Sequence, residues 1–180
     1  MLILASQSPR RRELMKYITD DYTVKVSDVD ETLPDGISPE EAVLCLSKIK
    51  ARPFASPQDT VIGADTVVAI DGEILGKPAN KEDAALMLRK LSGKTHSVFT
   101  GVTVIKNGKE HSFYAETKVT FFNLGDDEIA KYVATGEPLD KAGAYGIQGY
   151  GCLLVEKIDG DYFNVVGLPV SKLNHLLMSI

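Results

Sequence analysis

A basic turn near the start of the chain contains the first residues that suit ligand binding. Residues 6–12 read Ser-Gln-Ser-Pro-Arg-Arg-Arg, and Ser8 followed by proline is typical of a helix start. Backbone N–H groups at a strand-to-helix junction bind anions, and guanidinium groups bind phosphate oxygens in pairs. Cations oppose the dipole at a helix N-terminus. A phosphate site therefore explains Arg10 and Arg11 better than a solvated basic turn does.

A single acid interrupts an apolar run farther along the chain. Residues 60–70 are rich in β-branched side chains and predict a central strand that bends or ends near Asp65. Burying a carboxylate is costly unless it binds a metal or a hydrogen-bond donor. Asp65 is therefore a candidate ligand for a divalent cation and a candidate base for a water molecule. The alternative is an aspartate that caps a turn.

Three more positions suit phosphate or metal chemistry. Lys77 precedes a predicted helix and would neutralise phosphate charge, although most such lysines are solvated and the surrounding residues are not a P-loop. Asp30 and Glu31 lie in a predicted polar loop, residues 28–38. They are either solvated or the source of a second carboxylate for a metal, and their spacing does not separate these alternatives.

Residues 137–149 form a glycine-rich run that few structural demands would produce. Glycines let a backbone approach a ligand closely. Gln148 carries both a donor and an acceptor, which suits the edge of a nucleotide base. The alternative is a glycine-rich loop without a special role. The three histidines show no metal-ligand spacing.

Alternating helix and strand patterns must position these residues. Lys50 belongs to a predicted helix that Ser38 caps, and it lies beside the apolar stripe of that helix. Asn107-Gly108 predicts a hairpin turn. The patterns predict strands over residues 2–5, 22–26, 60–70, 98–105, 112–122 and 152–158. They predict helices over residues 9–18, 39–52, 81–91 and 127–135, and from residue 169 onward. This order indicates an α/β fold with a mixed sheet, as a single domain over residues 1–180.

Composition and charge exclude several classes of protein. The 180 residues are 44% hydrophobic and carry a net charge of -5, which disfavours a nucleic-acid partner. No apolar window approaches the ~20 residues of a membrane span, and no targeting segment is predicted. Two widely spaced cysteines, Cys45 and Cys152, predict reduced thiols and a cytoplasmic location.

Together these motifs resemble the Maf family of nucleotide pyrophosphatases. The resemblance extends over nearly the whole chain, in the family's order, through residues 4–11, 63–66, 77–78, 91–93, 140–149 and 167–169. It implies a Maf/ITPase-like fold, with an elongated mixed β-sheet flanked by helices and two lobes around a central cleft. It also implies hydrolysis of a nucleoside triphosphate between the α- and β-phosphates, with Mg²⁺ or Mn²⁺ as cofactor.

The resemblance also assigns roles to residues. Asp65 matches the general base. Positions linked to substrate choice are matched by Arg10, Thr66 and Gln148. Positions on the phosphate side are matched by Ser8, Arg11, Lys50 and Lys77. The metal is expected at Asp65 together with Glu31 or Asp30.

Residues 147–149, Ile-Gln-Gly, look like the subfamily that acts on dTTP and UTP, and modified pyrimidine nucleotides are further candidate substrates. A subfamily acting on 7-methyl-GTP typically has an acid in place of Gln148, and this substrate is the first alternative. The second is a nucleotide-binding regulator without catalysis, since the family is linked to arrest of cell division. Keeping modified nucleotides out of nucleic acids is another role that the resemblance implies. The expected protein partner is a second copy in a homodimer.

Overall fold

The computed structural model describes residues 1–180, which form two compact units. The first unit comprises Met1–Thr66, Thr100–Ala115 and Gly167–Ile180. The second comprises Val67–Phe99 and Glu116–Val166. None of the helices is long and apolar enough to span a membrane.

Seven strands form one mixed sheet in the order β2-β1-β3-β5-β6-β7, with β4 paired to β3. β1 runs parallel to β2 and β3, whereas β4 and β7 run antiparallel to their neighbours. The predicted mixed sheet is therefore confirmed. The strands are β1 (Leu2–Ala5), β2 (Thr23–Lys25), β3 (Thr60–Ile70), β4 (Glu73–Leu75), β5 (Thr95–Lys106), β6 (Lys109–Phe121) and β7 (Val155–Asp159).

The helices begin where the sequence supplies caps. Ser38 accepts a hydrogen bond from the N–H of Glu41, whose side chain accepts one from the N–H of Ser38. Ser8 and Asn80 cap two other helices through their side chains. The α-helices are α1 (Pro9–Met15), α2 (Pro39–Ala51), α3 (Lys81–Leu91), α4 (Asp126–Ala134), α5 (Tyr162–Val166) and α6 (Val170–Ser179). Short 3₁₀ segments are η1 (Arg52–Phe54), η2 (Glu137–Asp140), η3 (Ala142–Ala144) and η4 (Gly149–Leu154).

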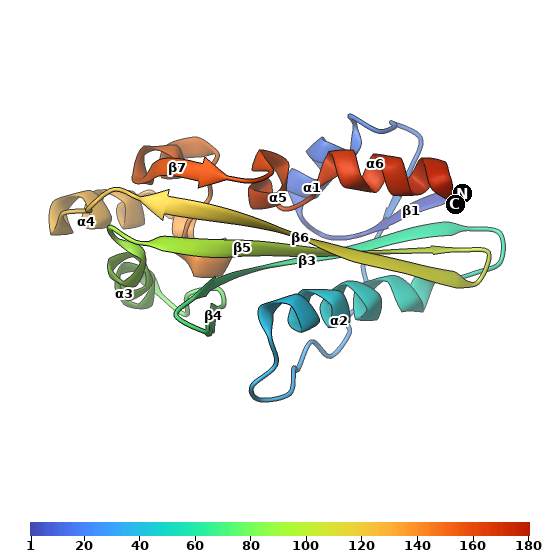
Figure 1. The fold of residues 1–180 in the computed structure, drawn as a ribbon, viewed down its shortest axis with the longest axis horizontal. Helices are drawn as coiled ribbons and strands as arrows, with labels where there is room; N and C mark the ends of the chain where they lie inside the picture. Colours follow the sequence, from blue (N-terminus) through green and yellow to red (C-terminus); the bar gives the residue numbers. More distant parts are fainter. The chain divides into compact units, whose positions relative to one another are not determined.

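In the first unit, α2 and α6 lie on opposite sides of the sheet (Figure 1). Two glycines bring α2 close to the strands. A Cβ atom added at Gly63 would lie 2.2 Å from the carbonyl oxygen of Ser47, and one at Gly101 would lie 2.2 Å from that of Val43. No other residue type fits this distance, so the backbone of α2 rests directly on β3 and β5.

In the second unit, α3 and α4 pack side by side (Figure 1) over an apolar core. The rings of His96, Phe121 and Tyr145 contact one another edge to face, with centroids 4.6 to 5.4 Å apart. His96 Nε2 also lies 2.7 Å from the Tyr145 hydroxyl. This cluster fixes Tyr145, which begins the turn that leads to Gln148.

Most predicted elements are confirmed, with three corrections. β3 does not end near Asp65 but continues to Ile70, because Lys50 of α2 donates a hydrogen bond to the acid and the residues beyond it, 67–70, form a second buried apolar run. The first helix ends at Met15 instead of residue 18. The strand expected over residues 152–158 is β7, Val155–Asp159, since the preceding residues form η4.

Candidate active site

A lysine and two carboxylates meet on the first unit. Asp65 lies in the middle of β3, and its Oδ1 accepts a hydrogen bond from Lys50 Nζ near the C-terminal end of α2. The same ammonium group lies 3.2 Å from Oε2 of Glu31. The side chains of Lys50 and Asp65 are 19% and 14% exposed. Lys50 and Asp65 are therefore largely withdrawn from water, whereas the side chain of Glu31 is 52% exposed, so a ligand has access to the group from that side.

The contact between Lys50 and Asp65 follows from the packing of α2 on β3. Gly63, two residues before Asp65, lets the last turns of α2 approach the strand. Lys50 flanks the buried face of α2 that contains Leu46 and Ser47, so its stem follows the sheet and its ammonium group ends beside the acid. The sequence position of Lys50 beside the apolar stripe is thus explained by a polar partner on the strand beneath.

The two neighbouring loop acids, Asp30 and Glu31, have different partners in the structure. Asp30 Oδ1 accepts hydrogen bonds from the Thr32 hydroxyl at 2.6 Å and the Thr32 N–H at 2.9 Å. The Thr32 hydroxyl, followed by its N–H, holds the pKa of Asp30 below its ordinary value. Asp30 therefore stabilises its own turn, and Glu31 is the acid that reaches Lys50.

Arg11 is buried, with only 9% of its surface exposed. Its Nε donates to the carbonyl oxygen of Gly167 at 2.8 Å, and its Nη2 donates to Thr66 Oγ1 at 3.0 Å. Its Nη1 donates to Ser6 Oγ at 3.4 Å. Burial lowers the pKa of the Arg11 guanidinium from its ordinary value, and the charge of Asp65 opposes this shift. Arg11 thus joins three segments of the first unit and places a positive charge near Asp65.

The remaining predicted residues of the first unit surround Arg11. Ser8 caps α1 by accepting a hydrogen bond from the Arg11 N–H at 3.4 Å. Thr66 Oγ1 lies 2.8 Å from Thr100 Oγ1 and so is held by two partners. Arg10 is half-buried on the first turn of the same helix. The basic turn, the acid and the lysine thus belong to one unit.

Two predicted residues belong to the second unit, and both are exposed. Lys77 follows β4 and precedes α3. Gln148 has extended backbone angles, φ -81° and ψ 165°, immediately before η4. The glycine-rich run is therefore a sequence of tight turns that ends by presenting Gln148 to solvent.

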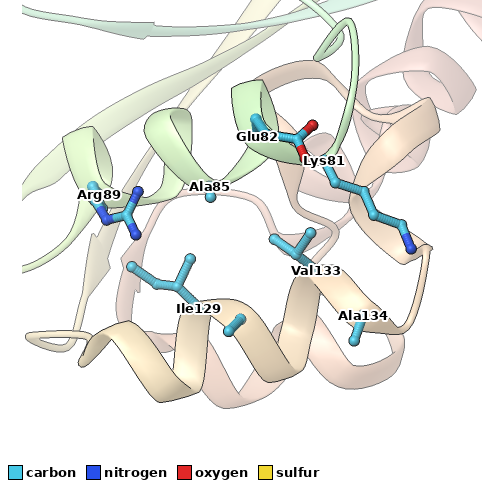
Figure 2. Close-up of a pocket in the computed structure, with 8 residues that line it drawn as sticks. Lys81, Glu82, Ala85, Arg89, Ile129, Val133 and Ala134 are labelled. Atoms are coloured by element: carbon cyan, nitrogen blue, oxygen red, sulfur yellow. The ribbon is translucent and has the colours of Figure 1, made fainter.

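A groove of about 330 Å³ lies between α3 and α4 in the second unit (Figure 2). Its floor consists of Ala85, Ile129 and Val133, and charged side chains of Lys81, Glu82 and Arg89 line its rim. None of the predicted site residues lines it, and no set of three or more metal-ligating side chains is present in the chain. The groove therefore contributes none of the predicted phosphate, base or metal contacts.

Sequence reasoning assigned no role to several residues that shape the site. Ser6, Thr100 and the Gly167 carbonyl all bind the Arg11–Thr66 pair. Gly167 begins one of the motifs of the family resemblance, and this motif was the one feature of the sequence that pointed to a role for it. Thr100 lay within a predicted strand, where a threonine is common.

Comparison with known proteins gives matches over the whole chain. A family model described as "Maf-like protein" matches residues 1–180. A "dTTP/UTP pyrophosphatase" of Bacillus pumilus (strain SAFR-032) is 55% identical over 173 residues, covering 95% of this chain and 92% of the relative. Proteins of the same name from Bacillus velezensis (strain DSM 23117 / BGSC 10A6 / LMG 26770 / FZB42) and Geobacillus sp. (strain WCH70) are 53% and 51% identical, covering 95% of this chain and 92% and 93% of their own lengths. Among solved structures, the Staphylococcus aureus Ham1 protein aligns with a TM-score of 0.48 and 19% identity, over 67% of this chain and 71% of that chain.

Proposed function

Because this chain belongs to the Maf family, we propose that it hydrolyses dTTP and UTP to the nucleoside monophosphate and pyrophosphate. Three relatives named for this activity are more than half identical to it over nearly their whole length. The observation that carries the proposal is the partly buried Asp65 carboxylate beside Lys50 and Glu31. Such a group suits activation of a water molecule next to a chain of phosphates.

In the proposed reaction, Asp65 takes a proton from water as the water oxygen bonds to the α-phosphorus. The bond from that phosphorus to the bridging oxygen breaks, and pyrophosphate leaves with the electron pair. Lys50 and Arg11 place positive charge near Asp65. This charge would stabilise the negative phosphate oxygens of a substrate bound beside Asp65. Ser8, Arg10 and Lys77 are proposed phosphate contacts. Positioning and charge stabilisation supply most of the acceleration in such reactions.

A divalent cation, Mg²⁺ or Mn²⁺, is the proposed cofactor, and the donors of the first unit fit it. Asp65 and Glu31 converge on one point, where the Lys50 ammonium group is their common cationic partner. Mg²⁺ is commonly bound through one or two carboxylates together with substrate phosphates, so two acids suffice. When bound, the metal would stabilise negative charge on the phosphate oxygens.

Base selection is proposed for Gln148, with Arg10 and Thr66 as further contributors. The glutamine amide both donates and accepts, as the O4 and N3–H edge of uracil and thymine requires. CTP has an amino group in place of the O4 acceptor, so the same amide orientation does not satisfy it. The exposed position of Gln148 is consistent with contact to a ligand.

The decisive experiment measures pyrophosphate release from a panel of nucleoside triphosphates that includes dTTP, UTP, CTP and 7-methyl-GTP. We expect release from dTTP and UTP with Mg²⁺ or Mn²⁺, none with chelator, and a loss of about 10²–10⁴-fold in Asp65→Asn. Release from 7-methyl-GTP alone would keep the reaction and overturn the base assignment. Nucleotide binding without any release would support a regulator without catalysis.

A cytoplasmic location and a homodimer complete the proposal. The two cysteines are free, with Cys152 exposed, which suits a reducing compartment. Sedimentation at several protein concentrations measures the oligomeric state, and a single monomeric species would contradict the dimer.

A further inference from the structure

The loop that presents Gln148 is held by two side chains from the preceding helix and 3₁₀ segment. Tyr132, in α4, accepts a hydrogen bond at its hydroxyl from the N–H of Gly146 at 3.2 Å. Glu137, the first residue of η2, accepts from the N–H of Tyr150 through Oε2 and from that of Gly151 through Oε1, both at 3.0 Å. These contacts fix the backbone on both sides of Gln148.

The two side chains are also bonded to each other. The Tyr132 hydroxyl donates to Glu137 Oε1 at 2.9 Å. Tyr132 is 4% exposed, and burial raises its pKa above the ordinary value, so the hydroxyl keeps its proton for this bond. The carboxylate of Glu137 thus accepts three hydrogen bonds, and two of them come from the backbone just after Gln148. Charge-assisted bonds of this kind are the stronger ones.

The backbone of the loop fits closely around this pair. Gly149 has φ +64°, and a Cβ atom there would lie 2.6 Å from Glu137 Oε2. A Cβ atom at Gly151 would lie 1.8 Å from the Gly146 carbonyl oxygen and 2.9 Å from the Tyr132 hydroxyl. The loop therefore closes on itself, with Gln148 at its exposed turn and the carboxylate at its base.

No ion pair in the structure accounts for a carboxylate at position 137. Lys141 Nζ is nearby, but it donates to the Glu137 carbonyl oxygen at 2.7 Å and to Asp140 Oδ1 at 2.8 Å. Each carboxylate oxygen of Glu137 instead accepts from an N–H of this loop. Its role is to set the path of residues 146–151.

We propose that Glu137 and Tyr132 are positioning residues for base selection, because they hold the backbone that orients the Gln148 amide. This inference rests on the proposed role of Gln148 in reading the base. It assigns a function to a carboxylate and a hydroxyl that do not themselves contact the nucleotide.

The test compares kcat/KM for UTP with that for CTP in Glu137→Gln, Tyr132→Phe and Gln148→Ala. In Glu137→Gln, one oxygen becomes a donor, so the side chain cannot accept from both Tyr150 and Gly151. We expect the UTP/CTP ratio to fall about tenfold in each of the two positioning variants, the effect of losing one such hydrogen bond. We expect kcat for UTP to change less than the ratio.

Glu128→Gln is the matched control. Glu128 also accepts a hydrogen bond from a backbone N–H, that of Gly125 at 2.9 Å, but at the start of α4. It should lower stability without changing the ratio. A merely structural role for Glu137 would give the same result as this control. If Glu137→Gln does not fold, Tyr132→Phe alone still tests the proposal.

The combined variants distinguish the role of Gln148 in base selection from the positioning role of Glu137 and Tyr132. If Glu137→Gln lowers the ratio in the parent but lowers it no further in the Gln148→Ala background, the positioning role is supported. If Gln148→Ala lowers the ratio but neither positioning variant does, the positioning role is overturned and the role of Gln148 stands. An unchanged ratio in Gln148→Ala overturns the role of Gln148 and the positioning role with it.

Discussion

At the scale of single residues, the ammonium group of Lys50 pairs with two acids, Asp65 and Glu31. Removing it in Lys50→Met leaves the partly buried Asp65 without its partner. We expect the free energy of unfolding to fall by about 1–2 kcal/mol, a value reduced for the partial exposure of these groups. In the Asp65→Asn background the same substitution should cost much less.

Urea unfolding of the four proteins in this cycle measures the coupling. Lys48→Met, on the same helix, is the control and should stay within about 0.5 kcal/mol of the parent. Equal losses in both backgrounds would show that the ion pair does not contribute to stability.

Arg11 combines a structural and a proposed substrate role, and stability measurements distinguish them. Its three hydrogen bonds inside the protein need the planar fork of a guanidinium group, which lysine lacks. We expect Arg11→Lys to lower the free energy of unfolding by about 2–3 kcal/mol. Arg12→Lys, at an exposed position on the same helix, should change it by less than about 0.5 kcal/mol. Loss of activity at full stability in Arg11→Lys would mean that Arg11 acts on substrate alone.

At the scale of elements, the contact of α2 with the sheet places Lys50 over Asp65. Gly63→Ala and Gly101→Ala would each push a methyl group against the α2 backbone. We expect losses of about 1–3 kcal/mol in the free energy of unfolding, with lower activity because Lys50 moves with the helix. Gly76→Ala is the control, since a Cβ there meets nothing within 4 Å. Thermal unfolding and pyrophosphate release check both parts, and parent-like stability in Gly63→Ala would contradict this packing.

The elements were largely predictable because their signals are local. The cap at Ser38, the turn at Asn107-Gly108 and the β-branched run of β3 depend on residues a few positions apart. The sequence left open whether β3 bends or ends near Asp65. It does not end there, because an acid at one position does not stop backbone pairing when a lysine from α2 is its partner. That lysine is 15 residues away, so no local pattern reveals the pair.

Local sequence patterns did not reveal the partners of the site residues either. The choice between Asp30 and Glu31 depended on the path of a loop, which spacing does not encode. The burial of Arg11 depended on the Gly167 carbonyl, 156 residues later. Residue types thus predicted the chemistry, whereas the partners of each residue required the fold.

At the scale of the whole molecule, the proposed general base, Asp65, belongs to the first unit, and Gln148, which is proposed to select the nucleobase, belongs to the second. Because Asp65 acts on the attacking water, which is common to all nucleotides, rate and selectivity should respond separately to substitution of these two residues. We expect Asp65→Asn to lower kcat for dTTP, UTP and CTP by similar factors, and Gln148→Ala to change the ratios among them. Steady-state kinetics on the three nucleotides checks this, and a change of selectivity in Asp65→Asn would contradict the division of roles.

The decrease in the free energy of unfolding at acid pH should depend on one buried histidine, His96. Burial lowers the pKa of His96 from its ordinary 6.5 to about 4. Its Nδ1 is buried without a hydrogen-bond partner, and its Nε2 contacts the Tyr145 hydroxyl. Between these pH values the unfolded chain binds a proton that the folded chain does not. The contribution of neutral His96 is therefore complete above pH 6.5 and is lost as the pH falls toward 4.

We expect this single group to lower the free energy of unfolding by about 3 kcal/mol between pH 6.5 and pH 4, because each pKa unit corresponds to about 1.4 kcal/mol. His96→Gln removes the titration, so its unfolding free energy should depend less steeply on pH over this range. His175→Gln, at an exposed position, should retain the slope of the parent. Urea unfolding at half-unit pH intervals measures all three. Parallel curves for the parent and His96→Gln would mean that carboxylates elsewhere set the acid limit.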